Sequence, residues 1–261
     1  MDPDVVIQVE HLKMAFGDFV IQEDMNFSIH KGDIFVVMGG SGCGKGTLLM
    51  HLIGLHAPAK GAIHYGRESL YGEAAGARDR IMRRIGVLFQ SGALISSLTL
   101  AENVALPLGA FTALSPRQMA EVVSYKLALV GLKGFEDYYP SEISGGMQKR
   151  AGLARAIAMD PEILFFDEPS AGLDPISAKM LDDLIESLRN SLGATIVLVT
   201  HELPSIFAIG TNSIFLDPKT RRIIAQGPPQ EILKTTDNPE VVRFLTRDNS
   251  ARRGVVNGVS S

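Results

Sequence analysis

A glycine-rich run at residues 39–47 has the composition of a loop that holds a chain of phosphates. It follows the apolar stretch Ile34–Met38 and leads into apolar residues spaced as one face of a helix. In such a turn the backbone N–H groups converge on phosphate oxygens at the positive end of the helix dipole. The Lys45 ammonium can then reach the β- and γ-phosphates. The run predicts a nucleotide site built from Gly39, Gly40, Ser41, Gly42, Cys43, Gly44, Lys45, Gly46 and Thr47.

One position of this run departs from the phosphate-binding motif. The motif places Ser or Thr directly after the lysine, where the hydroxyl ligates Mg²⁺, and this chain has Gly46 there. Thr47 cannot take over that role, because neighbouring residues of a helix point about 100° apart. We expect a water to fill this Mg²⁺ position, since the ion keeps waters readily. Nucleotide binding should persist through Lys45 and the loop amides, with weaker Mg²⁺ binding and slower turnover.

Two carboxylates, Asp167 and Glu168, close the apolar stretch Ile163–Phe166. Hydrolysis of a nucleoside triphosphate needs a carboxylate that holds Mg²⁺ and a polar group that orients the attacking water. Asp167 is predicted to hold the ion and Glu168 to orient the water. Gln90 is a candidate contact to Mg²⁺ and water, and His201 a candidate contact to the terminal phosphate. Each residue alone would fit an ordinary turn, but beside the phosphate-binding run they form a predicted catalytic set.

The small residues Ser144, Gly145 and Gly146 predict the start of a helix. Ser144 is a suitable N-cap, because its hydroxyl can accept from a backbone N–H of the first turn. The two glycines leave backbone amides open for the close approach of an anion. A plain turn or a helix C-cap is the alternative interpretation of these three residues.

Short apolar strands and one helical stretch position these residues. Strands are predicted at 5–9, 19–21, 25–29, 34–38, 62–65, 85–89, 163–166 and 195–199. Between about residues 98 and 137 the period becomes helical, and Ser115, Pro116 and Gln118 form a helix start with a capping box. Strands alternating with helices predict an α/β fold with a mainly parallel core sheet. We expect an antiparallel N-terminal β-subdomain, an inserted helical subdomain at about 96–150 and a disordered tail at 246–261.

The composition narrows the class of protein. The 261 residues and 46% apolar content suit one large domain or two joined subdomains. The formal net charge of −4 and the lack of a dense basic stripe argue against a nucleic-acid partner. No stretch is apolar enough to cross a bilayer, and the first residues lack the pattern of a secretory signal. The single cysteine, Cys43, fits a reducing compartment and is expected to fill space beneath the loop.

The order of these features resembles the nucleotide-binding subunit of ATP-binding-cassette (ABC) transporters, which are P-loop NTPases. The likeness covers about residues 5–245, and we expect residues 1–245 to form one ABC nucleotide-binding domain. The resemblance implies ATP and Mg²⁺ as cofactors, with Gln90 and Asp167 on the metal. The features run along the chain as follows: the phosphate-binding run, Gln90, Ser144–Gly146, Asp167–Glu168, Asp174 and His201.

The resemblance also implies roles for residues whose chemistry alone does not assign one. Phe16 would stack on adenine, since it stands before the glycine of the first hairpin. Ser144–Gly146 would close on the ATP of the opposite protomer, and Asp174 would communicate between the two sites. His201 would be the switch histidine, and Thr47 would contact the α-phosphate. These roles imply a homodimer with two ATP molecules sandwiched between its copies.

Four shorter segments resemble more narrowly the ATPase of mammalian-cell-entry (MCE)-type, or Mla-type, transporters, which move phospholipids between bacterial membranes or into plastids. The segments are 88–94, 144–147, 173–176 and 201–206. Met147 departs from the glutamine of most ABC signatures and agrees with this subfamily. The resemblance implies an integral membrane permease that docks over Ser91–Leu98, together with small accessory and MCE-type substrate-binding subunits. It implies a peripheral position on the cytoplasmic face of the inner membrane.

Two other functions remain open from the sequence. One is the ATPase subunit of an ABC importer for a polar solute such as an amino acid, which a co-purifying periplasmic receptor would identify. The other is a hydrolysis-impaired ATP-sensing subunit, which Gly46 favours. A soluble ABC protein of DNA repair or translation is disfavoured, because the chain holds one cassette without coiled-coil arms.

Overall fold

A six-stranded sheet forms the centre of the computed structural model, which describes residues 2–247. Its order is β10-β9-β3-β8-β7-β6, and all neighbouring strands are parallel except β10, which runs antiparallel to β9. The predicted α/β fold with a mainly parallel core sheet is therefore confirmed. The strands are β3 (Ile34–Gly39), β6 (Ile85–Leu88), β7 (Ile163–Asp167), β8 (Thr195–Val199), β9 (Asn212–Asp217) and β10 (Arg222–Gln226).

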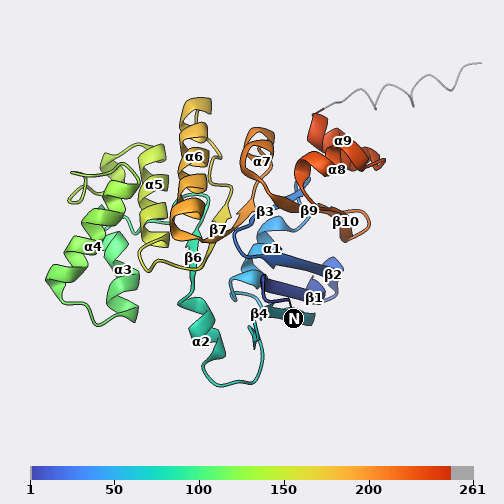
Figure 1. The fold of residues 1–261 in the computed structure, drawn as a ribbon, viewed down its shortest axis with the longest axis horizontal. Coiled ribbons are helices and arrows are strands. Elements are labelled where there is room, and N and C mark those ends of the chain that lie inside the picture. The colour runs from blue at the N-terminus through green and yellow to red at the C-terminus, as the bar shows by residue number, and fades with distance from the viewer. Residues whose placement is uncertain (1, 248–261) are drawn as a thin grey trace, which may run out of the picture.

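Both faces of this sheet are covered, because successive side chains of a strand point to opposite sides. Ile34 and Val36 of β3 belong to one apolar cluster, and Phe35 and Val37 belong to another. Helix α1 packs in the second cluster, and α5, α6 and α7 pack in the first. Figure 1 shows these three helices side by side along the sheet. The helices are α1 (Lys45–Leu52), α5 (Gly145–Ala156), α6 (Pro175–Leu192) and α7 (Leu203–Ile209).

A second, antiparallel sheet at the N-terminal end confirms the expected β-subdomain. Its order is β2-β1-β4-β5, with β1 (Val5–Phe16), β2 (Phe19–His30), β4 (Lys60–Tyr65) and β5 (Glu68–Ser69). The prediction of separate strands at 19–21 and 25–29 was wrong, because both lie in β2. Asp24, at φ 53°, lies within β2, and His11, at φ 46°, lies within β1, where the register shifts. These irregularities let both strands continue through polar residues.

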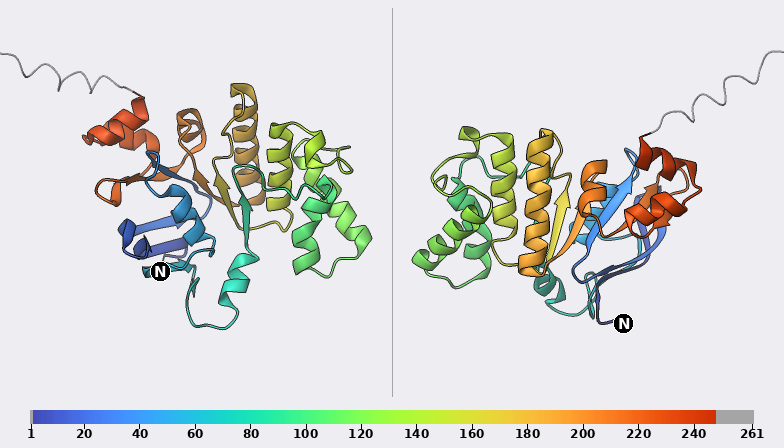
Figure 2. Two further views of the ribbon diagram at one scale, coloured as in Figure 1. Left: turned by 180° about the vertical axis from the view of Figure 1, so that it is seen from behind. Right: turned by 45° about the horizontal axis from the view of Figure 1, so that its top comes forward.

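Helices α3 and α4 form the opposite end of the molecule from this sheet (Figure 2). The predicted helix start is confirmed: Ser115 is the N-cap of α4, Pro116 its first residue, and Gln118 completes the capping box. Thr99 and Glu102 form a second capping box at α3, which we did not predict. The elements here are α3 (Leu100–Phe111), α4 (Pro116–Leu129) and the short 3-10 turn η1 (Pro140–Glu142). Helix α2 (Ala77–Met82) instead lies beside β5 of the N-terminal sheet.

The C-terminal part adds two short helices, α8 (Pro229–Thr235) and α9 (Pro239–Thr246). The prediction of a disordered tail was wrong for its first two residues, since Thr246 is the last residue of α9 and Arg247 is its C-cap. The rest of that prediction, 248–261, lies outside the described residues.

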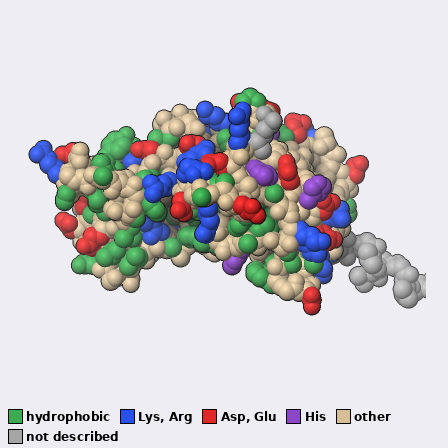
Figure 3. Space-filling model, turned by 90° about the horizontal axis from the view of Figure 1, so that it is seen from below, with side chains coloured by type: hydrophobic (Ala, Val, Ile, Leu, Met, Phe, Trp, Pro, Cys, Tyr) green, Lys and Arg blue, Asp and Glu red, His purple; other side chains and the backbone are tan. Residues whose placement is uncertain are grey.

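Charges of both signs are interspersed on the face of the molecule seen in Figure 3. Near α2, Arg80 lies 2.6 Å from Glu68, and Arg84 lies 2.7 Å from Glu162. These arginines are therefore already paired with carboxylates.

The contact between β6 and α5 leaves no room for a side chain at Gly86. A Cβ there would lie 2.1 Å from the carbonyl oxygen of Ala156. We expect Gly86→Ala to lower the free energy of unfolding by roughly 1–3 kcal/mol, because α5 must shift. Denaturant unfolding measures the change. Gly109→Ala in α3 is the control, since its Cβ would meet nothing closer than 3.9 Å; equal stability of the two variants would contradict the prediction.

Candidate active site

The run at residues 39–47 forms the turn between β3 and α1. Gly39, Gly42 and Gly44 have φ values of 147°, 76° and 99°, which favour glycine. A Cβ on Gly39 would lie 2.6 Å from the Leu216 carbonyl oxygen, and one on Gly44 would lie 2.5 Å from a methyl carbon of Ile21. The backbone of the loop therefore approaches its neighbours too closely for any other residue. Its amides lie at the N-terminus of α1, where the helix dipole favours an anion.

The Lys45 ammonium bends back over this loop. Its Nζ donates to the carbonyl oxygens of Gly39 at 2.9 Å and Gly40 at 3.2 Å. Cys43 is buried beneath the loop, and burial raises the pKa of its thiol. A raised pKa makes the thiolate scarce, so Cys43 is a packing residue, as predicted.

A buried amide that sequence reasoning missed supports the loop from β2. Gln22 Nε2 donates to the carbonyl oxygen of Cys43 at 2.9 Å and to that of Asp217 at 3.1 Å. The side chain is fully buried, so these bonds act in a medium of low dielectric constant. No sequence signal identifies Gln22, because its partners are backbone atoms distant along the chain.

Glu168 follows β7 and faces His201. His201 Nδ1 lies 2.8 Å from Glu168 Oε1, while Glu168 Oε2 is buried and has no partner among the described residues. Glu168 has φ 45°, a strained value for a residue with a side chain, and its N–H donates to the Val199 carbonyl oxygen at 2.8 Å. An unpaired buried carboxylate oxygen is costly, so the site suits a polar group that arrives from outside, such as a water.

Asp167 and Gln90 lie on the same side of the site as α1. Both line one cavity together with Gly46 and Thr47. Burial raises the pKa of Asp167, the Glu168 carboxylate raises it further, and Lys45 lowers it in part. A cation would relieve this repulsion. Residues 2–247 contain no cluster of three or more His, Cys, Asp or Glu side chains that could hold a metal. The oxygen donors of Asp167 and Gln90, which line one cavity, are of the kind that Mg²⁺ accepts, and the ion takes its other ligands from phosphates and waters.

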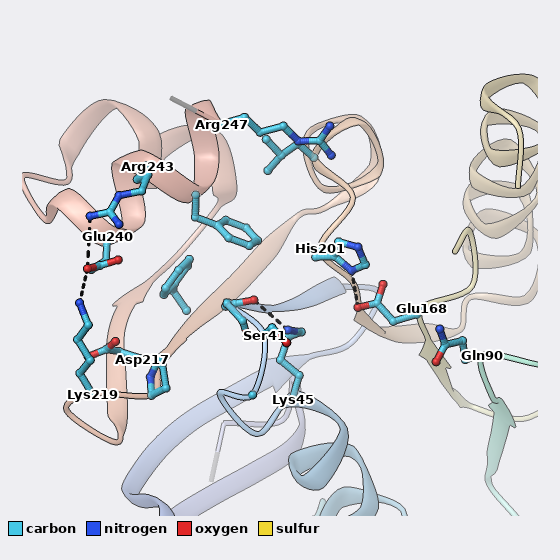
Figure 4. A pocket seen from close by; sticks show the side chains of 17 residues that line it. Ser41, Lys45, Gln90, Glu168, His201, Asp217, Lys219, Glu240, Arg243 and Arg247 are labelled. Carbon is cyan, nitrogen blue, oxygen red and sulfur yellow. Dashed lines mark hydrogen bonds and ion pairs between the residues drawn. The ribbon is translucent and has the colours of Figure 1, made fainter. Parts of the chain in front are cut away.

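Two adjoining cavities of about 870 and 600 Å³ make up the cleft over the loop. We refer to the two cavities together as the cleft. Figure 4 shows Ser41 and Lys45 on the loop, with Gln90, Glu168 and His201 across from them. Both cavities share Gly42, Lys45, Gln90, Glu168 and Pro218. The structure thus brings together residues from five separate parts of the chain.

The far wall of the cleft contains residues that the sequence did not indicate. Lys219 and Glu240 form an ion pair at 2.6 Å, and Arg243 of α9 lies 3.5 Å from the same carboxylate (Figure 4). Arg221 lines the cavity nearer to α1. No motif surrounds these residues, so only the fold reveals their place.

The predicted residues Ser144, Gly145, Gly146 and Asp174 line neither cavity of the cleft. Ser144 is the N-cap of α5, as predicted, and its Oγ accepts from Met147 N at 3.3 Å. Asp174 is the N-cap of α6, and hydrogen bonds from Ser177 lower the pKa of its carboxyl group. These residues begin two helices on the other side of the sheet from α1.

Phe16 also lies outside both cavities, at the end of β1. Its ring is 55% exposed and meets the His56 ring edge-on, with the centroids 5.8 Å apart. Phe19, which begins β2 and is 65% exposed, lines the cavity above α1 instead. Sequence reasoning named Phe16 and missed Phe19, although both flank the same turn.

Comparison with known families decides what kind of protein carries this cleft. The family described as ABC transporter matches residues 22–171, more than half of the chain. The chain belongs to the ABC transporter family. The matched stretch includes the loop, Gln90, Ser144–Gly146 and both carboxylates at the end of β7.

Curated relatives of this ABC protein include proteins of two names. It is 41% identical over 241 residues to the "Probable ribonucleotide transport ATP-binding protein mkl" of Mycobacterium tuberculosis, which covers 92% of this chain and 66% of that protein. It is 37% identical over 240 residues to the "Intermembrane phospholipid transport system ATP-binding protein MlaF" of Haemophilus influenzae, covering 92% of this chain and 90% of that protein. The resemblance to Mla-type ATPases is thereby confirmed. This ABC protein spans about two thirds of the length of the mycobacterial relatives.

Solved structures confirm the fold of an ABC cassette. The dimeric ATP-binding cassette MJ0796, in a post-hydrolysis state with ADP and Pi, is 27% identical with a TM-score of 0.77. It covers 85% of this chain and 98% of its own chain. The Clostridium perfringens protein cbiO1, part of the ABC transporter complex cbiONQ, is 26% identical with a TM-score of 0.80 and covers 96% and 98%. Among residues 2–247, no helix has the length and apolarity to span a membrane.

Proposed function

We propose that this ABC protein binds ATP with Mg²⁺ and hydrolyses it to energise a membrane transporter. One observation carries the proposal: the phosphate-binding loop faces Glu168, whose Oε1 is engaged by His201 and whose Oε2 has no partner within residues 2–247. The arrangement places an anion site and an oriented carboxylate in one cleft. Such a pairing is what phosphoryl transfer to water requires.

Each residue of the cleft has its own role in this reaction. Lys45 and the loop amides neutralise the phosphates. Glu168 accepts a hydrogen bond from the attacking water, and His201 holds Glu168 in place and contacts the γ-phosphate. Gln90 and Asp167 would hold Mg²⁺, which supplies a positive charge that offsets the charge of the phosphate oxygens.

The remaining predicted residues point to a homodimer. Ser144, Gly145 and Gly146 expose the first amides of α5, yet they lie outside this chain's own cleft. We propose that they close on the ATP of a second copy, with Asp174 beside them and Phe16 on the adenine. The related cassette MJ0796 is dimeric with ADP and Pi, which supports this arrangement. Residues 1–245 then form one nucleotide-binding domain, with a helical subdomain at about 96–150.

Phospholipid is the transported substrate that we propose. The MlaF relatives, named for intermembrane phospholipid transport, match nearly their whole length, whereas the mycobacterial relatives named for ribonucleotide transport match over 66% of theirs. The partners would be an integral permease docked over Ser91–Leu98, a small accessory subunit and an MCE-type substrate-binding subunit. The chain would lie on the cytoplasmic face of the inner membrane.

Purification of the assembled membrane complex tests the proposal in two steps. We expect Mg²⁺-dependent phosphate release from ATP and co-eluting phospholipid, identified by mass spectrometry. A co-purifying periplasmic receptor with a bound nucleotide or amino acid would instead identify a polar-solute importer. ATP binding without phosphate release would identify the sensing subunit that Gly46 favours, and failure to retain labelled ATP would contradict all three functions.

Gly46→Ser tests the missing hydroxyl at the Mg²⁺ site. A Cβ at this position meets nothing within 4 Å, so a serine fits without displacing a neighbour. We expect Mg²⁺ affinity to rise on the order of 10-fold, with faster turnover, because one ligand is restored. Mg²⁺ titrations of the hydrolysis rate measure it. Gly46→Ala is the matched control, since it adds the Cβ and the helix propensity without the hydroxyl; the account is wrong if both variants behave alike.

A further inference from the structure

A buried lysine that the mechanism above does not use lies behind Glu168. Lys149, in the second turn of α5, is 8% exposed. Its Nζ donates to the carbonyl oxygen of Pro169 at 2.8 Å and also to that of Ala171. Both acceptors belong to the segment that joins Glu168 to Asp174. The Lys149 ammonium therefore binds two backbone carbonyl groups of this segment.

Within residues 2–247, the charge of Lys149 is met by backbone carbonyl groups rather than by a carboxylate. No carboxylate of residues 2–247 forms an ion pair with its ammonium, so the two carbonyl oxygens are its principal acceptors. Burial lowers the pKa of the ammonium, and the Glu168 carboxylate offsets part of this change. A buried cation is costly unless polar groups surround it. Here the polar groups that offset this cost are carbonyl groups of the segment between Glu168 and Asp174.

That segment is a tight backbone turn. The Ala171 N–H donates to the Glu168 carbonyl oxygen at 3.1 Å, and the Leu173 N–H donates to the Ser170 carbonyl oxygen at 3.1 Å. The turn begins at Glu168, which itself has a strained φ of 45°. A strained residue persists only where its surroundings hold it. Lys149, which lines neither cavity of the cleft, restrains this turn through its two hydrogen bonds.

A second cation of α5 binds the segment that follows Gln90. Arg155, in the last turn of α5, donates to the carbonyl oxygens of Gly92 at 2.9 Å and Ala93 at 2.8 Å. Helix α5 thus contacts, through two cations, the segments that follow two of the predicted catalytic residues, Glu168 and Gln90. Its first turn is the Ser144–Gly146 segment.

We propose that Lys149 is a positioning residue, which holds the Glu168–Asp174 turn in register with the helix that begins at Ser144. The expected effect on turnover rests on the proposed function. The restraint of the Glu168–Asp174 turn by Lys149 rests on geometry alone. When Ser144–Gly146 engages a nucleotide, α5 would move. The Lys149 ammonium and the carbonyl groups of Pro169 and Ala171 would then transmit this movement to Glu168.

Hydrogen exchange tests the hold without relying on hydrolysis. Lys149→Met removes the ammonium but keeps an unbranched side chain up to the position of Cε. We expect exchange in residues 168–174 to accelerate at least ~10-fold. Lys126→Met is the matched control: Lys126 is also buried, but its ammonium contacts Asp160, away from the cleft. Unchanged exchange in Lys149→Met, or equal acceleration in both variants, would overturn the proposal.

Steady-state kinetics of the assembled complex test the consequence. In Lys149→Met we expect kcat to fall about 10²-fold, because a misplaced water-orienting group loses rate without losing affinity. The Kd for ATP should stay as in the unmodified chain, and Lys149→Arg should restore part of the rate by keeping the charge. A parallel loss of ATP affinity, or no rescue by arginine, would contradict a positioning role. If the unmodified complex hydrolyses no ATP, the proposed function fails, and the exchange experiment alone decides the role of Lys149.

Discussion

Glu168→Gln should reduce the rate of ATP hydrolysis by roughly 10²–10⁴-fold while ATP still binds. The amide keeps the size of the side chain, and its oxygen can still accept from His201 Nδ1, now at 2.8 Å from Oε1. It cannot polarise a water as a carboxylate does. Loss of the negative charge also removes one of the causes that raise the pKa of Asp167. Binding of ATP and Mg²⁺ should therefore not weaken, and the variant should accumulate as an ATP-loaded dimer.

Single-turnover hydrolysis and size-exclusion chromatography with ATP measure the two effects of Glu168→Gln. Glu240→Gln is a suitable control, because that carboxylate lines the far wall of the same cleft and is paired with Lys219 at 2.6 Å. We expect its turnover to stay near that of the unmodified chain. Preserved turnover in Glu168→Gln would remove this residue from the reaction.

The part of the site predicted from the sequence is the part whose chemistry lies in short, contiguous motifs. Residues 39–47 hold their loop geometry through the closely spaced glycines Gly39, Gly42 and Gly44, and Asp167 and Glu168 end the motif that begins with β7. Because parallel strands end at the same edge of the sheet, Gln90 and His201 necessarily meet them there. The order of strands and the family resemblance were enough to place this set in one cleft.

The rest depends on contacts between distant parts of the chain. Gln22 supports the loop only because β2 runs beside it, and α9 closes the far wall through Arg243. Strand β2 continues past Asp24 through a local irregularity that an alternating pattern does not reveal. Lys149 looks like an ordinary helical lysine until the fold places two carbonyl oxygens against it. No local pattern of side chains in the sequence records these features.

Lys45→Ala should weaken ATP binding by on the order of 10²-fold or more, since a hydrogen bond to a charged group contributes about 1.5–3 kcal/mol and the charge itself is also lost. Lys45 Nζ lies 2.9 Å from the Gly39 carbonyl oxygen and lines both cavities of the cleft, so a bound polyphosphate would meet it directly. Equilibrium binding of labelled ATP, with and without Mg²⁺, measures the loss. Lys219→Ala is the control, because that ammonium lines the far wall and is bound to Glu240. Thermal unfolding should show both variants folded. Full affinity in Lys45→Ala would mean that the loop amides alone hold the nucleotide, and the charge would then serve hydrolysis rather than binding.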